Sequence, residues 1–225
     1  MTSSQTPVRF TKIDDLNRRE HRFLVESDDC SFLGEYTARA GYSHSETNDK
    51  IISLKMKPDA IRQKPFRGKF KSRAIAYWAE RLSMAFPLAD ARLAVWVPVP
   101  GSCPRGHPDH DDRLIRVLRR AYGTQLEIAS GLLSQEGERI AAHDAIERPT
   151  PDQLVAQWVV DISGVPPNAT RFVVFDDVVS RGASFKAAQR IILERFPHAT
   201  VIGLFLARTV HDDPPLPMFS FFEDS

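Results

Sequence analysis

FVVFDDVVSRGAS, residues 172–184, joins an apolar run to two adjacent acids and a short polar turn. The first four residues are aromatic or β-branched, a composition typical of a strand that is buried on both faces of a parallel sheet. Asp176 and Asp177 interrupt this run, and a buried carboxylate without partners costs several kcal/mol, roughly. We therefore expect both acids to face a cleft at the end of the strand.

The turn that follows the acids has the features of a phosphate site. Gly182 allows close approach of the backbone, and Ser180 and Ser184 supply hydroxyl groups where a helix begins. Ionised carboxylates only accept hydrogen bonds, and the two hydroxyl groups of a ribose can donate them. A ribose 5-phosphate suits both halves of this stretch. The alternative is an acid pair that caps a neighbouring helix or pairs with arginines.

The rest of the chain alternates predicted strands and helices, with no G-x-G-x-x-G fingerprint and no Walker loop. This order predicts an open α/β sheet with helices on both faces. The segment 134–153 is polar and turn-rich, and we favour a lid over a surface hairpin for it. The expected strands are 92–100, 124–135, 171–179 and 201–209, and the expected helices are 71–86, 111–123 and 184–196.

Bulk composition excludes several classes of protein. The chain has 225 residues, 42% of them hydrophobic, and a net charge of +1, so any attraction to nucleic acid must come from a local patch. Two cysteines make a disulfide framework improbable, and no apolar run is long enough for a membrane span. The first 20 residues lack the apolar core of a secretory signal, which predicts a cytoplasmic protein.

VVFDDVVSRGAS resembles the phosphoribosyl pyrophosphate (PRPP) motif of type I phosphoribosyltransferases. The resemblance implies that Asp176 and Asp177 bind the ribose hydroxyls and that the turn wraps the 5-phosphate. The PRPP-binding residues implied in this way are Asp176, Asp177, Val178, Val179, Ser180, Arg181, Gly182, Ala183 and Ser184.

VPVPGSCPRG, residues 97–106, is similar to the pyrophosphate loop of the same fold, especially in its ComF-like branch. This similarity implies that Gly101, Ser102 and Arg105 contact pyrophosphate. The pattern Arg148, Thr150, Gln153 and the Leu-Lys pair at Lys55 also resemble that branch. The cysteine pairs of its zinc finger and its Gly-Phe-Asn-Gln run are missing, so the wider superfamily is the firmer comparison.

The resemblance implies an α/β fold of the type I phosphoribosyltransferase (Rossmann-like) kind, with a central, mainly parallel sheet flanked by helices. We divide the chain into an N-terminal hood (1–90), a core (91–213) and a Pro/aromatic tail (214–225). The implied reaction transfers 5-phosphoribosyl from PRPP to a nucleobase-like acceptor and releases pyrophosphate. The alternative is a PRPP-binding sensor or a DNA-processing accessory protein without catalysis. Whether the chain forms a homodimer is left open.

The implied chemistry needs no covalent nucleophile, because the transition state resembles an oxocarbenium ion. Mg²⁺ would arrive with PRPP oxygens and need no direct protein ligand. Asp176, Asp177 and Arg105 are the catalytic candidates, and Arg139 and Arg148 are lid candidates for the pyrophosphate. We expect Asp177→Asn to weaken PRPP binding and to leave the fold intact.

Two further segments invite other interpretations. CPRGHPDHDD, residues 103–112, has the composition of a zinc site, but its spacing favours a polar loop with a helix cap. RQKPFRGKFKSR, residues 62–73, carries six cations and two phenylalanines without an acid. This segment could hold single-stranded nucleic acid, attract an anionic substrate, or be a plain solvated surface.

Overall fold

A computed structural model describes residues 7–137 and 148–211. Its central element is a six-stranded sheet in the order β1-β2-β8-β7-β3-β4, in which only β1 runs antiparallel to its neighbour. The expected α/β class with a mainly parallel sheet is confirmed. The strands are β1 (Thr11–Lys12), β2 (Asp29–Thr37), β3 (Val95–Pro98), β4 (Glu127–Ile128), β7 (Arg171–Val179) and β8 (Thr200–Val210).

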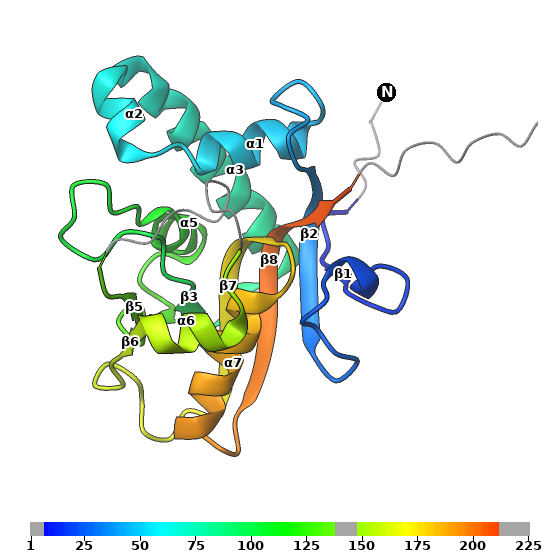
Figure 1. The fold of residues 1–225 in the computed structure, drawn as a ribbon, viewed down its shortest axis with the longest axis vertical. Coiled ribbons are helices and arrows are strands. Elements are labelled where there is room, and N and C mark those ends of the chain that lie inside the picture. Colours follow the sequence, from blue (N-terminus) through cyan, green and yellow to red (C-terminus); the bar gives the residue numbers. More distant parts are fainter. Residues whose placement is uncertain (1–6, 138–147, 212–225) are drawn as a thin grey trace, which may run out of the picture.

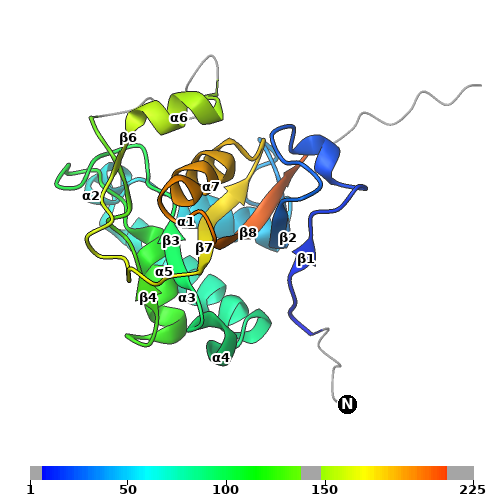
Figure 2. The ribbon, with the colours of Figure 1, turned by 90° about the horizontal axis from the view of Figure 1, so that it is seen from below.

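Helices cover both faces of the sheet. Figure 2 shows α6 and α7 on one side of it and α3, α4 and α5 on the other. A separate antiparallel pair consists of β5 (Leu133–Gln135) and β6 (Trp158–Val160). The helices are α1 (Glu46–Leu54), α2 (Pro58–Gln63), α3 (Gly68–Ala85), α4 (Leu88–Ala91), α5 (Arg113–Tyr122), α6 (Pro151–Gln157) and α7 (Ala183–Arg195), with short 3₁₀ turns η1 (Arg18–Glu20) and η2 (Pro65–Arg67).

The alternation of side chains along β7 divides the interior into two cores. Phe172 and Val174 pack with α7, whereas Val173 and Phe175 pack with α1, α3 and α5. All four side chains are buried, as expected for a strand inside a parallel sheet. Because neighbouring residues of a strand point to opposite faces, the same alternation sends Asp176 and Asp177 in opposite directions.

The strand expected at 171–179 and the helices that flank the sheet are confirmed. In the N-terminal part, several helices and strands were not predicted. Residues 29–37 form β2, which lies parallel to β8 along nearly its whole length (Figure 1). Helices α1 and α2 were also not predicted. The segment 1–90 therefore contributes two strands to the same sheet as the residues after 91.

The single strand expected at 124–135 is wrong. A turn in which the Leu132 amide donates to the Ala129 carbonyl, 3.1 Å away, separates β4 from β5. β4 extends the central sheet beside β3, and β5 joins β6. No helix in residues 7–137 or 148–211 is long and apolar enough to cross a membrane.

Gly203 of β8 offers a test of the packing on the α7 side. A Cβ there would lie 2.8 Å from Cys30 Sγ and 2.9 Å from a ring carbon of Phe185. We expect Gly203→Ala to lower the free energy of unfolding by about 1–3 kcal/mol, because overpacking shifts the neighbours. Gly164→Ala, with no atom within 4 Å of its Cβ, is the matched control. Urea unfolding measures both, and an equal effect of the two would contradict the packing described.

Candidate functional site

The two sequence motifs meet at one edge of the sheet. The chain leaves β3 for α5 and β4 on one side, whereas β7 lies on the other side of β3. The loops that follow β3 and β7 therefore lead away in opposite directions, and ligands of open α/β sheets usually bind at such a point. The loop 101–106 follows β3, and the turn 180–184 follows β7. The fold thus brings the predicted pyrophosphate loop and phosphate turn to the same edge.

Asp176 and the turn 180–184 line one hollow. Its wall also includes Arg148 and Phe205, and the turn leads directly into α7. Gly182 has a φ of 82° and no side chain caps the first turn of α7. The first amide groups of a helix have no partner within it, so this end of α7 offers donors to an anion. Ser180 and Ser184 lie in the same wall.

A segment of the N-terminal part supports this turn from behind. The Phe23 amide donates to the Arg181 carbonyl at 2.9 Å, and the ring of His21 hydrogen bonds to the Ser180 carbonyl. His21 is fully buried, and burial lowers its pKa. A Cβ on Gly182 would lie 2.6 Å from Leu24, so the close contact requires glycine. Sequence reasoning missed this support, because residues 21–24 carry no motif.

The other side of the turn is held by the chain before α6. The Arg181 guanidinium donates to the carbonyls of Arg148 and Pro149, the latter at 3.3 Å. Thr150 and Gln153 form a capping box at the start of α6, so these two residues of the Arg, Thr, Gln pattern have a structural role. Arg139 and half of the segment expected to be a lid, residues 138–147, lie outside the described residues, as does the tail 214–225.

Asp176 faces the hollow and is held in place by its neighbour's backbone. Its Oδ1 accepts a hydrogen bond of 2.8 Å from the Asp177 amide. Burial and the adjacent Asp177 carboxylate raise the pKa of Asp176 to about 7. An acid with this pKa changes charge near neutral pH and responds to any cation or donor that enters the hollow.

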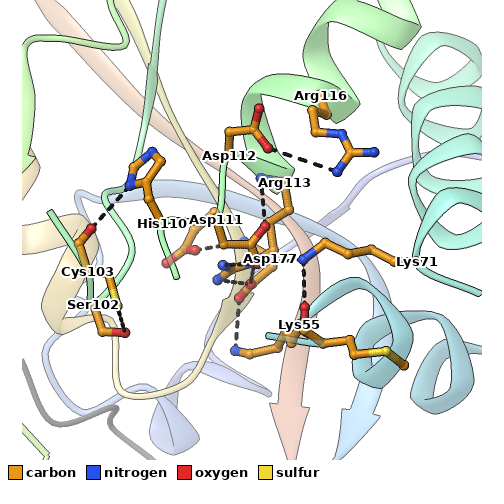
Figure 3. A network of polar contacts seen from close by, with 12 residues as sticks. Lys55, Lys71, Ser102, Cys103, His110, Asp111, Asp112, Arg113, Arg116 and Asp177 are labelled. Atoms are coloured by element: carbon orange, nitrogen blue, oxygen red, sulfur yellow. Dashed lines mark hydrogen bonds and ion pairs between the residues drawn. The ribbon is translucent and has the colours of Figure 1, made fainter. Parts of the chain in front are cut away.

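Asp177 points to the opposite face and is locked in ion pairs (Figure 3). Its side chain is only 3% exposed; Lys55 Nζ lies 3.1 Å from one oxygen, and Arg113 Nη2 lies 2.6 Å from the other. Burial alone would raise the pKa of Asp177, but Lys55 and Arg113 outweigh it and lower the pKa. The alternative of an acid paired with an arginine thus describes Asp177 in this structure, and not Asp176.

The ion pairs continue away from Asp177 through α5 into α3. Arg113 Nη1 lies 3.1 Å from Asp111, and the same oxygen of Asp111 lies 2.7 Å from Lys71 Nζ. Lys71 also donates to the Met56 carbonyl at 2.7 Å. Lys71 is therefore buried, and it does not belong to the basic surface expected at 62–73. Lys55, Asp177, Arg113, Asp111 and Lys71 thus form one ion-pair network.

The loop after β3 lines a second cleft beside the first. Gly101, Cys103, Arg105 and Arg113 belong to its wall, and Arg105 also donates to the Ser130 carbonyl. Ser102 lies next to Cys103, with its hydroxyl 4.0 Å from the thiol sulfur. His110 Nδ1 is 3.2 Å from the Cys103 carbonyl oxygen, which keeps this ring near the backbone. No group of three or more His, Cys, Asp or Glu side chains that could hold a metal ion is found among the described residues.

Comparison with known proteins adds no assignment. A scan against protein-family models found no match, and a search of curated proteins found no relative.

The ion pairs of Asp177 change the expectation for its substitution. Asp177→Asn leaves Lys55 and Arg113 without their carboxylate, so we now expect it to destabilise the fold by about 3–5 kcal/mol. Asp112→Asn is the matched control, because Asp112 is 53% exposed and 4.0 Å from Arg116. That control should cost less than about 0.5 kcal/mol. Urea unfolding at pH 7 compares them, and equal losses would refute the structural role of Asp177.

The raised pKa of Asp176 predicts that the stability of the fold depends on pH. Its raised pKa means that the folded state binds a proton more tightly than the unfolded state, so stability falls as pH rises from about 4 to about 7. Asp176→Asn removes this loss and still accepts from the Asp177 amide. We expect the variant to gain on the order of 1 kcal/mol over the parent at pH 8 and nothing at pH 4. Parallel stability profiles from pH 4 to pH 8 would contradict this.

Proposed function

We propose that the protein binds PRPP at the carboxyl end of β7 and transfers its 5-phosphoribosyl group to a nitrogen of a nucleobase-like acceptor. One observation carries the proposal: Asp176, the Gly182 turn and the uncapped start of α7 line a single hollow. The hollow lies at the carboxyl end of β7, and the motif in it resembles that of type I phosphoribosyltransferases. A sugar phosphate with free hydroxyls is the ligand class that uses all of these groups.

The two acids have different roles in this proposal. The turn 180–184 receives the 5-phosphate, and the Asp176 carboxylate accepts a hydrogen bond from a ribose hydroxyl. Asp177 acts through its ion pairs with Lys55 and Arg113, and Arg113 also lines the second cleft. It is thus a positioning residue, in place of the direct ribose ligand implied by the resemblance.

Cations near the loop after β3 are suited to the leaving group. Arg105 and Arg113 line the second cleft, and Lys55, which is 43% exposed, shares the Asp177 carboxylate with Arg113. During transfer the bond from C1 to the pyrophosphate oxygen breaks, a bond from C1 to the acceptor nitrogen forms, and the nitrogen loses its proton to solvent. The cations stabilise the charge that develops on pyrophosphate.

Mg²⁺ fits this site only when it is coordinated mainly by oxygens of the substrate. Among the described residues, Asp176 is the one carboxylate in the wall of the hollow, and both oxygens of Asp177 are engaged by cations. Mg²⁺ prefers several oxygen ligands in octahedral geometry, and pyrophosphate and ribose oxygens supply them. When bound, the ion would neutralise charge on the leaving group.

A second candidate is a protein that binds PRPP without turnover, as a sensor or a DNA-processing accessory. The ion pairs of Asp177 favour this second candidate, because they leave only one of the two acids to hold the ribose. The candidates share the binding step and differ in the release of pyrophosphate.

Calorimetry with PRPP and Mg²⁺ tests the shared step. We expect Ser180→Ala combined with Ser184→Ala to weaken binding by about 10-fold or more, because each hydroxyl bonded to a charged phosphate contributes about 1.5 kcal/mol. Ser72→Ala with Ser163→Ala is the matched control, since both of these serines are exposed. No binding by the parent chain, or equal effects of the two pairs, would defeat the proposal.

Turnover is tested by following pyrophosphate release with PRPP, Mg²⁺ and a panel of nitrogen bases. Release that depends on a base supports transfer, and Asp176→Asn should then reduce kcat/KM at least 10-fold, the loss of about 1.4 kcal/mol of transition-state binding. Binding without release under any acceptor would favour the sensor.

A further inference from the structure

A second surface with an unusual composition lies at α2, η2 and the first turns of α3. Its side chains are two exposed phenylalanines, Phe66 (61%) and Phe70 (38%), among cations. Arg67 is half-buried and the other cations are exposed. We call this the basic aromatic surface; it consists of Lys64, Phe66, Arg67, Lys69, Phe70 and Arg73.

The four cations of this surface form no ion pairs with the described part of the chain. No acid occurs from residue 60 to residue 79. Arg62 is paired with Asp109 and Lys71 with Asp111, whereas Lys64, Arg67, Lys69 and Arg73 have no carboxylate within ion-pair distance in the described part of the chain. Lys69 and Arg73 are four residues apart in one helix, where like charges repel. A chain with a net charge of only +1 therefore concentrates unpaired positive charge here.

The two phenylalanines of this surface are not part of the hydrophobic core either. The apolar side of α3 is buried through Ile75, Trp78 and Leu82, and it packs in the core next to the sheet. Phe66 and Phe70 precede that stripe and face solvent, and Lys69 Nζ lies 5.2 Å from the centre of the Phe70 ring. Exposed rings among cations offer flat apolar faces within reach of positive charge.

We propose that the basic aromatic surface binds single-stranded nucleic acid. The four cations attract the phosphates, and Phe66 and Phe70 stack against unpaired bases. The surface adjoins the candidate site, because Arg62 donates to the Pro108 carbonyl and pairs with Asp109 in the loop after β3. A bound strand would therefore pass close to the loop after β3. This inference does not depend on the proposed function.

Other anionic partners use such a surface less well. In a duplex the faces of the bases are stacked and closed to the rings, so only the cations would contribute. A membrane-surface helix needs a broad apolar face directed outward, whereas the apolar face of α3 is buried in the core. An unpaired strand uses both the charges and the rings.

Fluorescence anisotropy with a labelled oligothymidylate of 20 nucleotides tests the proposal on the full chain. Affinity should fall as salt rises, with a log–log slope of about −2.8 if all four cations contact phosphates. Lys64→Glu with Lys69→Glu should weaken binding at least 10-fold and make the slope shallower. Arg9→Glu with Arg92→Glu makes the same charge change at exposed positions outside the surface and should alter affinity less than 2-fold.

Removal of the rings separates stacking from charge. Phe66→Ala with Phe70→Ala should weaken binding by about 5-fold or more and leave the salt slope unchanged. All four positions are exposed, so urea unfolding should show that each variant retains the parent's stability. Absence of binding at 50 mM salt, an equal effect of the Arg9 and Arg92 control, or binding to phosphatidylserine vesicles without binding to the oligonucleotide would overturn the proposal.

Discussion

The buried carboxylate of Asp177 joins segments that lie far apart in the sequence and share one core. It pairs with Lys55 after α1 and with Arg113 at the start of α5, and Arg113 passes the contact through Asp111 to Lys71 in α3. Charges of alternating sign in a low-dielectric region depend on one another, since removal of one leaves its neighbours buried without compensation. These ion pairs add to the apolar packing that holds α1, α3 and α5 beside β7, and they compensate the burial of an acid inside an apolar strand.

The pairing of Asp177 also gives a physical account of two adjacent acids. Strand alternation places one carboxylate on each face of the sheet, so neighbours in sequence enter different environments. Asp177 meets two cations that lower its pKa, whereas Asp176 meets the hollow beside α7 and its pKa is raised to about 7. The charge on Asp177 contributes to the raised pKa of Asp176, so the acid held in ion pairs shifts the titration of the acid that lines the hollow. A substitution at either position will change the titration of the other.

The sequence was sufficient where one pattern determined the environment. The run 171–179 predicted β7 because an apolar strand before two acids has few other solutions, and Gly182 before a helix predicted the turn. Prediction from the sequence failed where a residue's environment is set by a segment far away in the sequence. β2 is mixed in polarity and is fixed by its pairing with β8, and Lys71 looks like its exposed neighbours until Asp111 is brought to it by the fold. His21 and Leu24 carry no local signal, although they contact the turn.

The support of the turn from behind bears on how a phosphate could bind there. A loop that must be ordered by its ligand loses affinity to conformational entropy, whereas a fixed loop does not. Phe23 and His21 hold the carbonyls of Arg181 and Ser180 on one side, and Arg181 reaches the carbonyls before α6 on the other. The segment that carries Phe23 and His21 is itself tied down, because Lys186 of α7 pairs with Asp28 at 2.7 Å. The backbone amides at the start of α7 are thus oriented before any anion arrives, which is the condition under which a helix end binds phosphate with few side-chain contacts.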